Sequence, residues 1–175
     1  MSPLHTLSPH IPGRRQWLAA ALPAVGAGMA LAALGPAALA AAPQSTPVEL
    51  WKDPQCGCCQ DWVEHMQAQG FSFTVHPTGN AAVRARLGLP SQLGSCHTAL
   101  VGGYLIEGHV PAADVRRLLQ QKPQALGLAV PGMPVGSPGM DGPVYGNRRD
   151  PYDVLLVARN GSTRVFSSYH GKPRA

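Results

Sequence analysis

The chain has 175 residues, of which 45% are hydrophobic and 13% are charged, enough for one domain with one hydrophobic core. Its 14 Lys and Arg residues against 9 Asp and Glu give a formal net charge of +5, and the basic residues are scattered along the chain. A mild and dispersed positive charge forms no nucleic-acid-binding patch, so nucleic acid is not expected as a partner.

Residues 1–40 are predicted to be an export signal. Two adjacent arginines precede an uncharged run rich in Ala, Gly and Leu, which ends in an A-x-A pattern at 38–40. This order is typical of a cleaved signal peptide, and a retained membrane anchor is the alternative. The stretch GRRQWLA resembles a twin-arginine signal with Trp17 in place of the usual Phe, although Sec signals also carry paired arginines. We therefore expect a working domain of residues 41–175 without a stable membrane anchor.

Hydrophobic periodicity predicts alternating strands and helices in this domain. The predicted elements are a strand at 48–51, a helix that follows the cysteines and ends near Gly70, a strand at 71–76, a helix at 80–88 with Asn80 as its N-cap, two strands within 98–110 joined at Gly102-Gly103, and a helix at 111–121. A β-α-β unit followed by a hairpin and a helix is the thioredoxin-like arrangement. The sequence thus predicts an α/β domain with a thioredoxin-like fold.

The segment after the last of these helices departs from the pattern. Residues 127–146 contain six glycines and four prolines and are predicted to form no regular element. Long loops in small domains are usually functional or disordered. This loop holds two Pro-Gly-Met tripeptides, at 131–133 and 138–140. Residues 153–169 then predict a β-hairpin with an Asn-Gly turn, an addition at the C-terminal end of the domain.

Three of the four cysteines lie together in the motif CGCC, in the loop that enters the first helix: Cys56, Cys58 and Cys59. Cys56 and Cys59 have C-x-x-C spacing, which suits a redox-active dithiol as well as a metal site. They are the candidate catalytic pair if the protein is redox active. The helix dipole is expected to lower the pKa of Cys56. Cys58 is surplus to dithiol chemistry.

Cys96 and His97 are expected to lie against this cluster, because in a thioredoxin-like fold the loop that enters the third strand faces the C-x-x-C turn. Four thiols and an imidazole in one place suit a soft metal ion. Structural disulfides are the alternative, since cysteines of an exported protein tend to pair. Copper(I) fits better than zinc, because it also accepts thioether sulfur, which Met133 and Met140 would supply.

Three further candidate ligands lie outside the cysteine motif and its partner Cys96-His97. His109 ends the fourth predicted strand, from which its side chain could point toward the site. Met133 and Met140 belong to the Pro-Gly-Met tripeptides, and core packing is their alternative role.

The blocks CGCC, SCHTALVGGYLIEGHVP and GLAVPGMPVGSPGM, in this order, resemble the exported CopG-type copper-resistance proteins, a family long treated as a domain of unknown function. The resemblance covers about residues 48–170. It implies a thioredoxin-like domain of the bacterial periplasm that binds copper, with a change of copper oxidation state as a further activity. The ligands it implies are Cys56, Cys58, Cys59 and Cys96, with His97, His109, Met133 and Met140 as further members.

Three functional hypotheses follow. The first is a periplasmic protein of copper resistance or homeostasis that holds Cu(I), as one ion or a small cluster. In this hypothesis it also exchanges electrons between thiols and copper and interacts with other periplasmic copper-handling proteins. The second is a thiol–disulfide oxidoreductase acting on proteins. The third is a metal delivery or storage module without catalysis. In the first, bound Cu(I) keeps the Cys56–Cys59 disulfide open, so metal state and thiol state are linked.

Overall fold

The computed structural model describes residues 45–171, so the predicted export signal in residues 1–40 lies outside the described range. No helix within the described range is long and apolar enough to cross a membrane. The elements are β1 (Thr46–Lys52), α1 (Gly57–Ala68), β2 (Phe71–His76), α2 (Ala81–Arg86), η1 (Ser91–Leu93), β3 (His97–Val101), β4 (Tyr104–Glu107), α3 (Ala112–Gln121), β5 (Gly127–Ala129), η2 (Pro143–Tyr145), β6 (Tyr152–Val157) and β7 (Thr163–Tyr169).

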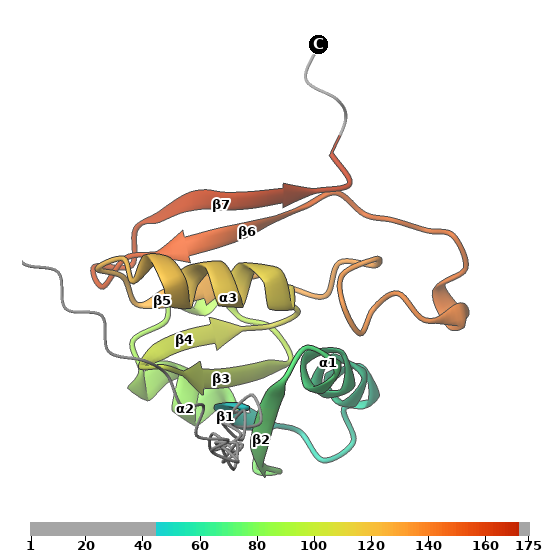
Figure 1. Ribbon diagram of the computed structural model, residues 1–175, viewed down its shortest axis with the longest axis horizontal. Helices are drawn as coiled ribbons and strands as arrows, with labels where there is room; N and C mark the ends of the chain where they lie inside the picture. The colour runs from blue at the N-terminus through green and yellow to red at the C-terminus, as the bar shows by residue number, and fades with distance from the viewer. Residues whose placement is uncertain (1–44, 172–175) are drawn as a thin grey trace, which may run out of the picture. The chain divides into compact units, whose positions relative to one another are not determined.

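The strands form a mixed seven-stranded sheet in the order β2-β1-β3-β4-β5-β6-β7 (Figure 1). β1 runs parallel to β2 and antiparallel to β3, and β3 and β4 form a hairpin. β5 lies parallel to β4, and β6 and β7 add a second hairpin at the edge of the sheet. The predicted α/β class is confirmed, and the predicted C-terminal hairpin is present as β6 and β7.

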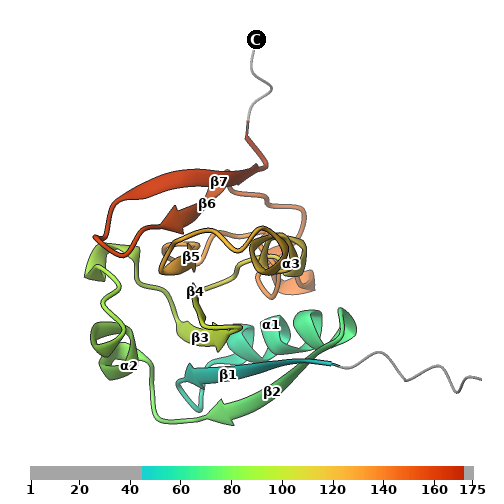
Figure 2. The same cartoon turned by 60° about the vertical axis from the view of Figure 1, so that its left-hand side comes forward.

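Helices cover both faces of this sheet, as Figure 2 shows from a second direction. α1 and α3 pack on one face, where Trp62 and Val115 are fully buried beside Leu50 of β1. On the opposite face, beside α2, Leu93 packs with Leu105 of β4. Each fully buried large apolar side chain stabilises the fold by about 1.5–3 kcal/mol. The sheet between these two layers gives the cysteine-bearing turn a rigid support.

The first helix buries one apolar stripe. Cys59, Trp62, Val63 and Met66 are the buried residues of α1, and they follow the i, i+3, i+4, i+7 spacing of one helix face. Gly70 follows the helix with a φ of +82°, a conformation that glycine adopts at low cost. Because Cys59 belongs to the buried stripe, the first turn of α1 directs it inward.

Asn80 is the N-cap residue of α2, as predicted, but its side chain makes no capping hydrogen bond to the helix. Its Nδ2 atom instead donates hydrogen bonds to the carbonyl oxygen of Ser95, at 3.2 Å, and to the hydroxyl of Thr98, at 3.1 Å. These tertiary acceptors replace the local capping interaction. Asn80 therefore ties the start of α2 to the segment that enters β3.

The prediction that residues 127–146 form no regular element is wrong in two places. Gly127–Ala129 form β5, and Pro143–Tyr145 form the short 3-10 turn η2. β5 fits beside β4 because Gly127 has no side chain, since a Cβ there would collide with the backbone of Leu105. Three residues are too few to show a strand period in a sequence, so this element could not be predicted from its pattern.

β7 is the edge strand of the sheet beside β6, and side chains hydrogen-bond it to α3. Asp114 of α3, 4% exposed, accepts hydrogen bonds from Arg117, from the hydroxyl of Ser167 and from the hydroxyl of Tyr169. The edge strand is thus held by a polar network as well as by its pairing with β6.

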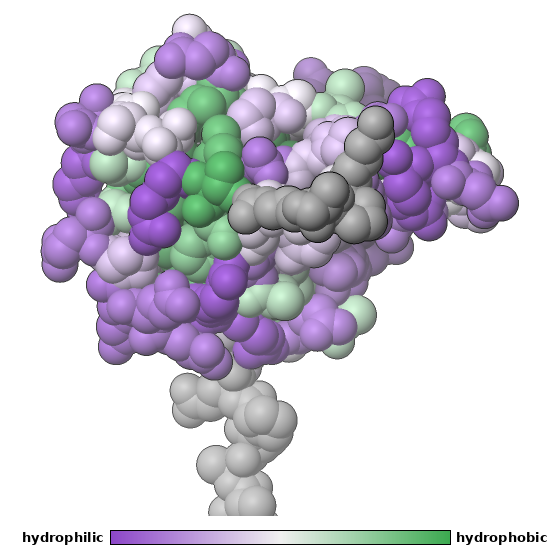
Figure 3. Space-filling view, turned by 90° about the horizontal axis from the view of Figure 1, so that it is seen from above, coloured by the Kyte–Doolittle hydropathy of each residue, from purple (hydrophilic) through white to green (hydrophobic). Residues whose placement is uncertain are grey.

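Viewed from above, the molecule presents a mostly hydrophilic face crossed by one strip of hydrophobic residues (Figure 3).

Candidate metal centre

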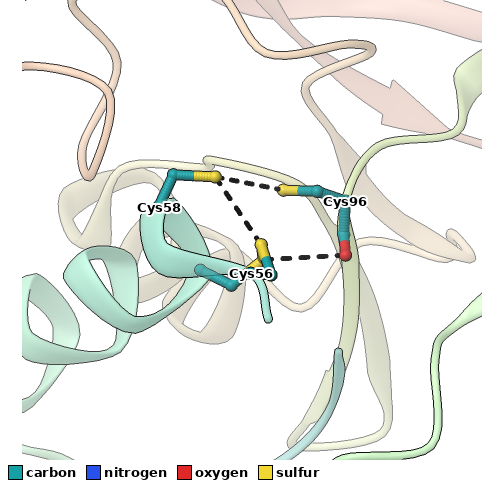
Figure 4. Close-up of side chains that lie close together, drawn as sticks. Cys56, Cys58 and Cys96 are labelled. Carbon is teal, nitrogen blue, oxygen red and sulfur yellow. Dashed lines mark hydrogen bonds between the residues drawn. A yellow bond between two sulfur atoms is a disulfide. The ribbon is translucent and has the colours of Figure 1, made fainter. Parts of the chain in front are cut away.

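The four cysteines converge on the start of α1. Cys56 is the N-cap residue of α1, and Cys58 and Cys59 lie in its first turn. Cys96 comes from the segment that enters β3, on the other side of the site (Figure 4). The Sγ atoms of all four lie within 4.8 Å of one another. The expectation that Cys96 lies against the CGCC turn is therefore confirmed.

Cys56 and Cys59 are joined by a disulfide, and Cys58 and Cys96 are free thiols. The Sγ atom of Cys58 lies 3.6 Å from that of Cys56 and 4.0 Å from that of Cys96, and Figure 4 shows the Cys58 and Cys96 side chains pointing toward each other. Cys58 thus stands between the disulfide and the fourth cysteine. The lowered pKa expected for Cys56 applies to its reduced form and stays a prediction.

Two buried imidazoles adjoin Cys96. The Nε2 atom of His109 lies 3.1 Å from the Sγ atom of Cys96, and its Nδ1 atom lies 2.8 Å from the carbonyl oxygen of Pro138. A carbonyl oxygen only accepts, so Nδ1 carries the proton and the Nε2 lone pair faces the thiol. The Nδ1 atom of His97 lies 3.4 Å from the same sulfur. Cys96, His97 and His109 thus form a second group with metal-ligand geometry, which shares Cys96 with the first.

Burial sets the charge state of these groups. It lowers the pKa of His97 well below 6.5, and the neighbouring His109 lowers it further. Burial likewise lowers the pKa of His109, although the hydrogen bond to Pro138 opposes this. Burial, followed by the nearby Cys58 thiol, raises the pKa of Cys96 to about 12. At neutral pH the group therefore consists of neutral imidazoles, the form that binds metals, and a protonated thiol.

His97 also carries an unpaired polar atom. The residue is fully buried against Trp62, with ring centroids 4.4 Å apart, and its Nε2 atom has no hydrogen-bond partner among residues 45–171. An unpaired buried polar group costs about 1–3 kcal/mol. The thiols and neutral imidazoles of this group together fit a soft metal ion such as copper.

Both Pro-Gly-Met tripeptides pack beside the centre, through their backbones. The amide of Gly132 donates to the carbonyl oxygen of Gly94 at 3.1 Å. Gly139 lies against α1 so closely that a Cβ there would be 2.7 Å from the carbonyl oxygen of Cys58. The carbonyl oxygen of Pro138, from the second tripeptide, accepts a hydrogen bond from Nδ1 of His109. The tripeptides stand out in the sequence for their sulfurs, whereas the role of their backbone leaves no residue-type pattern that could be predicted.

The two methionines of these tripeptides differ in their surroundings. Met133 is 53% exposed, whereas Met140 is 7% exposed and its sulfur accepts a hydrogen bond from the Tyr145 hydroxyl at 3.3 Å. Neither sulfur hydrogen-bonds to a cysteine in the described part of the chain. The structure therefore brings together the four cysteines and two histidines of the predicted ligand set. A ligand role for the two methionines stays a prediction.

The geometry agrees with comparisons to known proteins. Residues 93–140 match the family described as "Protein of unknown function, DUF411". The chain is similar to a solved structure named "Copper resistance protein copG- Form 1", with 44% identity and a TM-score of 0.67 over 73% of this chain and 100% of that one. The structure named Form 2 gives the same identity and TM-score over 72% and 99%. A search of curated proteins gave no match. This identity and coverage show that the chain belongs to the CopG family of copper-resistance proteins.

Proposed function

We propose that this protein binds Cu(I) in the bacterial periplasm and serves copper resistance or homeostasis. The observation that carries the proposal is the convergence of four cysteine sulfurs within 4.8 Å of one another. Thiolate and imidazole are ligands that copper accepts, and thiolate selects Cu(I) in particular. The copper-resistance names of the two similar structures support the same conclusion.

The proposed ligands fall into three sets. The four cysteines supply thiolates once the disulfide is reduced, and because a thiolate can bridge two ions, they have the capacity for a small copper cluster. His97 and His109 supply neutral nitrogen on the side of Cys96. Met133 and Met140, from the two Pro-Gly-Met tripeptides, are proposed as further thioether ligands. Zinc remains the less suitable ion, since it has little use for thioether.

We also propose that copper and thiols exchange electrons here. Two thiols of Cys56 and Cys59 would give one electron each to two Cu(II) ions, which become Cu(I), while an S–S bond forms and two protons leave. The disulfide between Cys56 and Cys59 supports this step, because it shows that the two sulfurs reach each other within the fold. The reverse reaction, in which two Cu(I) ions reduce the disulfide, uses the same atoms.

A second candidate function is thiol–disulfide exchange with protein substrates. The favouring observation is a disulfide at the start of a helix with the Cys58 sulfur 3.6 Å from that of Cys56. An incoming thiolate would attack one sulfur of the disulfide and form a mixed disulfide. Delivery or storage of copper without catalysis is the third candidate. It uses the same metal site and differs only in lacking electron transfer.

The fold and the export route belong to the same proposal. The parallel β1-α1-β2 unit, the β3-β4 hairpin and α3 support a thioredoxin-like core, with the cysteine pair at the start of α1. Residues 1–40 are proposed as a signal peptide of the twin-arginine or the Sec type, and residues 41–175 as the single working domain. N-terminal sequencing of periplasmic protein should then find a start near Ala41. A chain that keeps Met1 and stays in the membrane would contradict this.

Anaerobic copper titration with thiol counting tests the proposed function. Fully reduced protein should bind Cu(I) against a chromophoric competitor, and the number of reactive thiols should fall as copper is added. Protein with the Cys56–Cys59 disulfide intact should bind less copper, because two of the sulfur ligands are occupied. Equal copper binding by reduced and oxidised protein, or copper binding that leaves all four thiols reactive, would overturn the proposal.

A further inference from the structure

An ion pair with a buried carboxylate lies beside the proposed copper centre. Glu107, the last residue of β4, is fully buried, and its Oε1 atom lies 2.9 Å from Nη1 of Arg84 in α2. Its Oε2 atom accepts a hydrogen bond from the hydroxyl of Thr98 at 2.5 Å. A buried carboxylate is costly unless its charge is paired and its oxygens are hydrogen-bonded. Both conditions are met here, so the Glu107 side chain is held in one position.

The ion pair and its neighbours converge on the peptide of Ser95. The backbone N–H of Ser95 donates to Glu107 Oε1 at 2.7 Å. Its carbonyl oxygen accepts from Arg84 Nη1 at 3.1 Å and from Asn80 Nδ2 at 3.2 Å. Its hydroxyl donates to the carbonyl oxygen of Gly132 in the loop at 2.5 Å. β4, α2 and the Pro-Gly-Met loop therefore each hold a different polar group of this one residue.

Ser95 directly precedes Cys96, so a fixed Ser95 peptide fixes the position from which the Cys96 side chain starts. The Cys96 sulfur stands 4.0 Å from that of Cys58 and 3.1 Å from Nε2 of His109. Glu107 also constrains the distance between the Cys96 sulfur and Nε2 of His109, because it lies two residues before His109 in the same chain segment. The ion pair is thus connected to both residues of the contact between Cys96 and His109.

A second ion pair, in which only the carboxylate is buried, offers a comparison. Asp114 and Arg117 are also 2.9 Å apart, and Asp114 is nearly as buried as Glu107. That pair bonds the edge strand β7, through the hydroxyls of Ser167 and Tyr169 and the carbonyl oxygen of Phe166, whereas the Glu107 pair bonds the backbone next to a proposed ligand. A buried ion pair is weak evidence of stabilisation, since apolar residues of equal volume often serve as well. What distinguishes Glu107 and Arg84 is therefore the peptide that they hold.

We propose that Glu107 and Arg84 are positioning residues of the copper centre, which hold the Ser95 peptide so that the Cys96 thiol stays between Cys58 and His109. Both act through Cys96. The effect of the Glu107–Arg84 pair on copper binding rests on the proposed function, but the effect of the pair on the reactivity of the Cys96 thiol rests on geometry alone. The two effects are therefore tested separately.

The first test requires no copper. Cys58 and Cys96 are the free thiols beside the disulfide, so an alkylating reagent applied without reductant marks these two, and peptide mass spectrometry gives the rate for each. Glu107→Gln keeps the side-chain shape but places an amide group among hydrogen-bond donors. The rate at Cys96 should rise about tenfold, as expected when a charged buried hydrogen bond is broken, while the rate at Cys58 stays unchanged.

Two further variants control this test. Asp114→Asn removes the charge of the comparison pair and should leave both alkylation rates unchanged. Arg84→Lys keeps the positive charge but loses the second bond to Ser95, so its Cys96 rate should fall between those of the wild type and Glu107→Gln. Circular dichroism checks that each variant folds, and Arg84→Lys carries the test if Glu107→Gln does not fold. An unchanged Cys96 rate in a folded variant, or an equal rise in Asp114→Asn, overturns the positioning role.

The second test measures Cu(I) affinity in two backgrounds. Glu107→Gln should weaken Cu(I) binding about tenfold in the otherwise wild-type protein. It should have no further effect in Cys96→Ser protein, because the thiol through which Glu107 acts is then absent. An equal loss in both backgrounds overturns the inference that Glu107 acts through Cys96. Wild-type protein that binds no Cu(I) overturns the proposed function instead, and the alkylation rates then decide the positioning role.

Discussion

The Nε2 atom of His109 lies 3.1 Å from the sulfur of Cys96, and the other ring nitrogen of His109 lies 2.8 Å from the carbonyl oxygen of Pro138. The carbonyl holds the proton on Nδ1, so a neutral nitrogen faces the thiol. Burial and the Cys58 thiol raise the pKa of Cys96 to about 12, which keeps this thiol protonated at neutral pH. A metal ion bound by Cys96 must displace that proton.

Copper binding should therefore release protons and strengthen as the pH rises. Cys96 should contribute about one proton per binding event throughout the neutral range, since its pKa lies far above it. The buried histidines should not compete at neutral pH, because their lowered pKa values leave them neutral. Calorimetric titration in buffers of different ionisation enthalpy measures the protons released. Cys96→Ser should release fewer, and equal release by both proteins would contradict the role of this thiol.

Gly139→Ala should destabilise the protein and disturb the start of α1. A Cβ at this position would lie 2.7 Å from both the carbonyl oxygen of Cys58 and the amide nitrogen of Trp62, which are backbone atoms that cannot easily move. We expect the free energy of unfolding to fall by about 3 kcal/mol. Denaturant unfolding of the disulfide-intact protein measures this.

Gly132→Ala is the matched control, because it lies at the same position of the other Pro-Gly-Met tripeptide. Its φ of +70° resembles the +82° of Gly139, but nothing lies within 4 Å of the added Cβ. The loss should therefore be only the backbone cost of about 1 kcal/mol. Equal losses for the two variants would show that the second tripeptide does not pack on α1.

Replacing the loop methionines by leucine separates a ligand role from a packing role. Met133→Leu should leave stability unchanged because Met133 is 53% exposed, and Met140→Leu should cost about 1 kcal/mol because a buried sulfur loses its bond to Tyr145. Both changes together should weaken Cu(I) binding in a competition assay. Unchanged copper affinity in the double variant would contradict the ligand role of both residues.

The contact between Tyr169 and Asp114 should make stability sensitive to alkali. Burial, and then the hydrogen bond to the Asp114 carboxylate, raise the pKa of Tyr169 from 10.0 to about 12. A group whose pKa is raised by folding stabilises the protein fully below its unfolded pKa and loses that effect as the pH passes through the folded pKa. The difference in unfolding free energy between wild type and Tyr169→Phe should therefore shrink from pH 10 to pH 12. A difference that stays constant over this range would contradict the assignment.

The parts of the site that could be predicted are those set by local periodicity and chain order. The apolar spacing of α1 places Cys59 inward, and the strand order brings Cys96 opposite Cys58. The remaining contacts join segments far apart in the chain through backbone atoms or shared polar networks. Pro138 with His109 and Ser95 with Glu107 are examples, and neither pair leaves a spacing or composition pattern that a sequence would reveal.

The third cysteine of the CGCC motif gives the most direct test of the proposed copper function. Dithiol exchange needs only an attacking and a resolving thiol, and Cys56 and Cys59 supply both. Cys58 is surplus to that chemistry, but a copper centre gains from every added thiolate. The measurement is the anaerobic Cu(I) stoichiometry of reduced Cys58→Ser and wild-type protein, with reduction of a disulfide substrate assayed on the same samples.

We predict that Cys58→Ser binds less copper than the wild type while it still forms and reduces the Cys56–Cys59 disulfide. Cys96→Ser should behave in the same way, because its sulfur lies 4.0 Å from that of Cys58. A Cys58→Ser protein that binds copper as the wild type does, yet loses disulfide exchange, would contradict the copper function and favour a thiol–disulfide oxidoreductase.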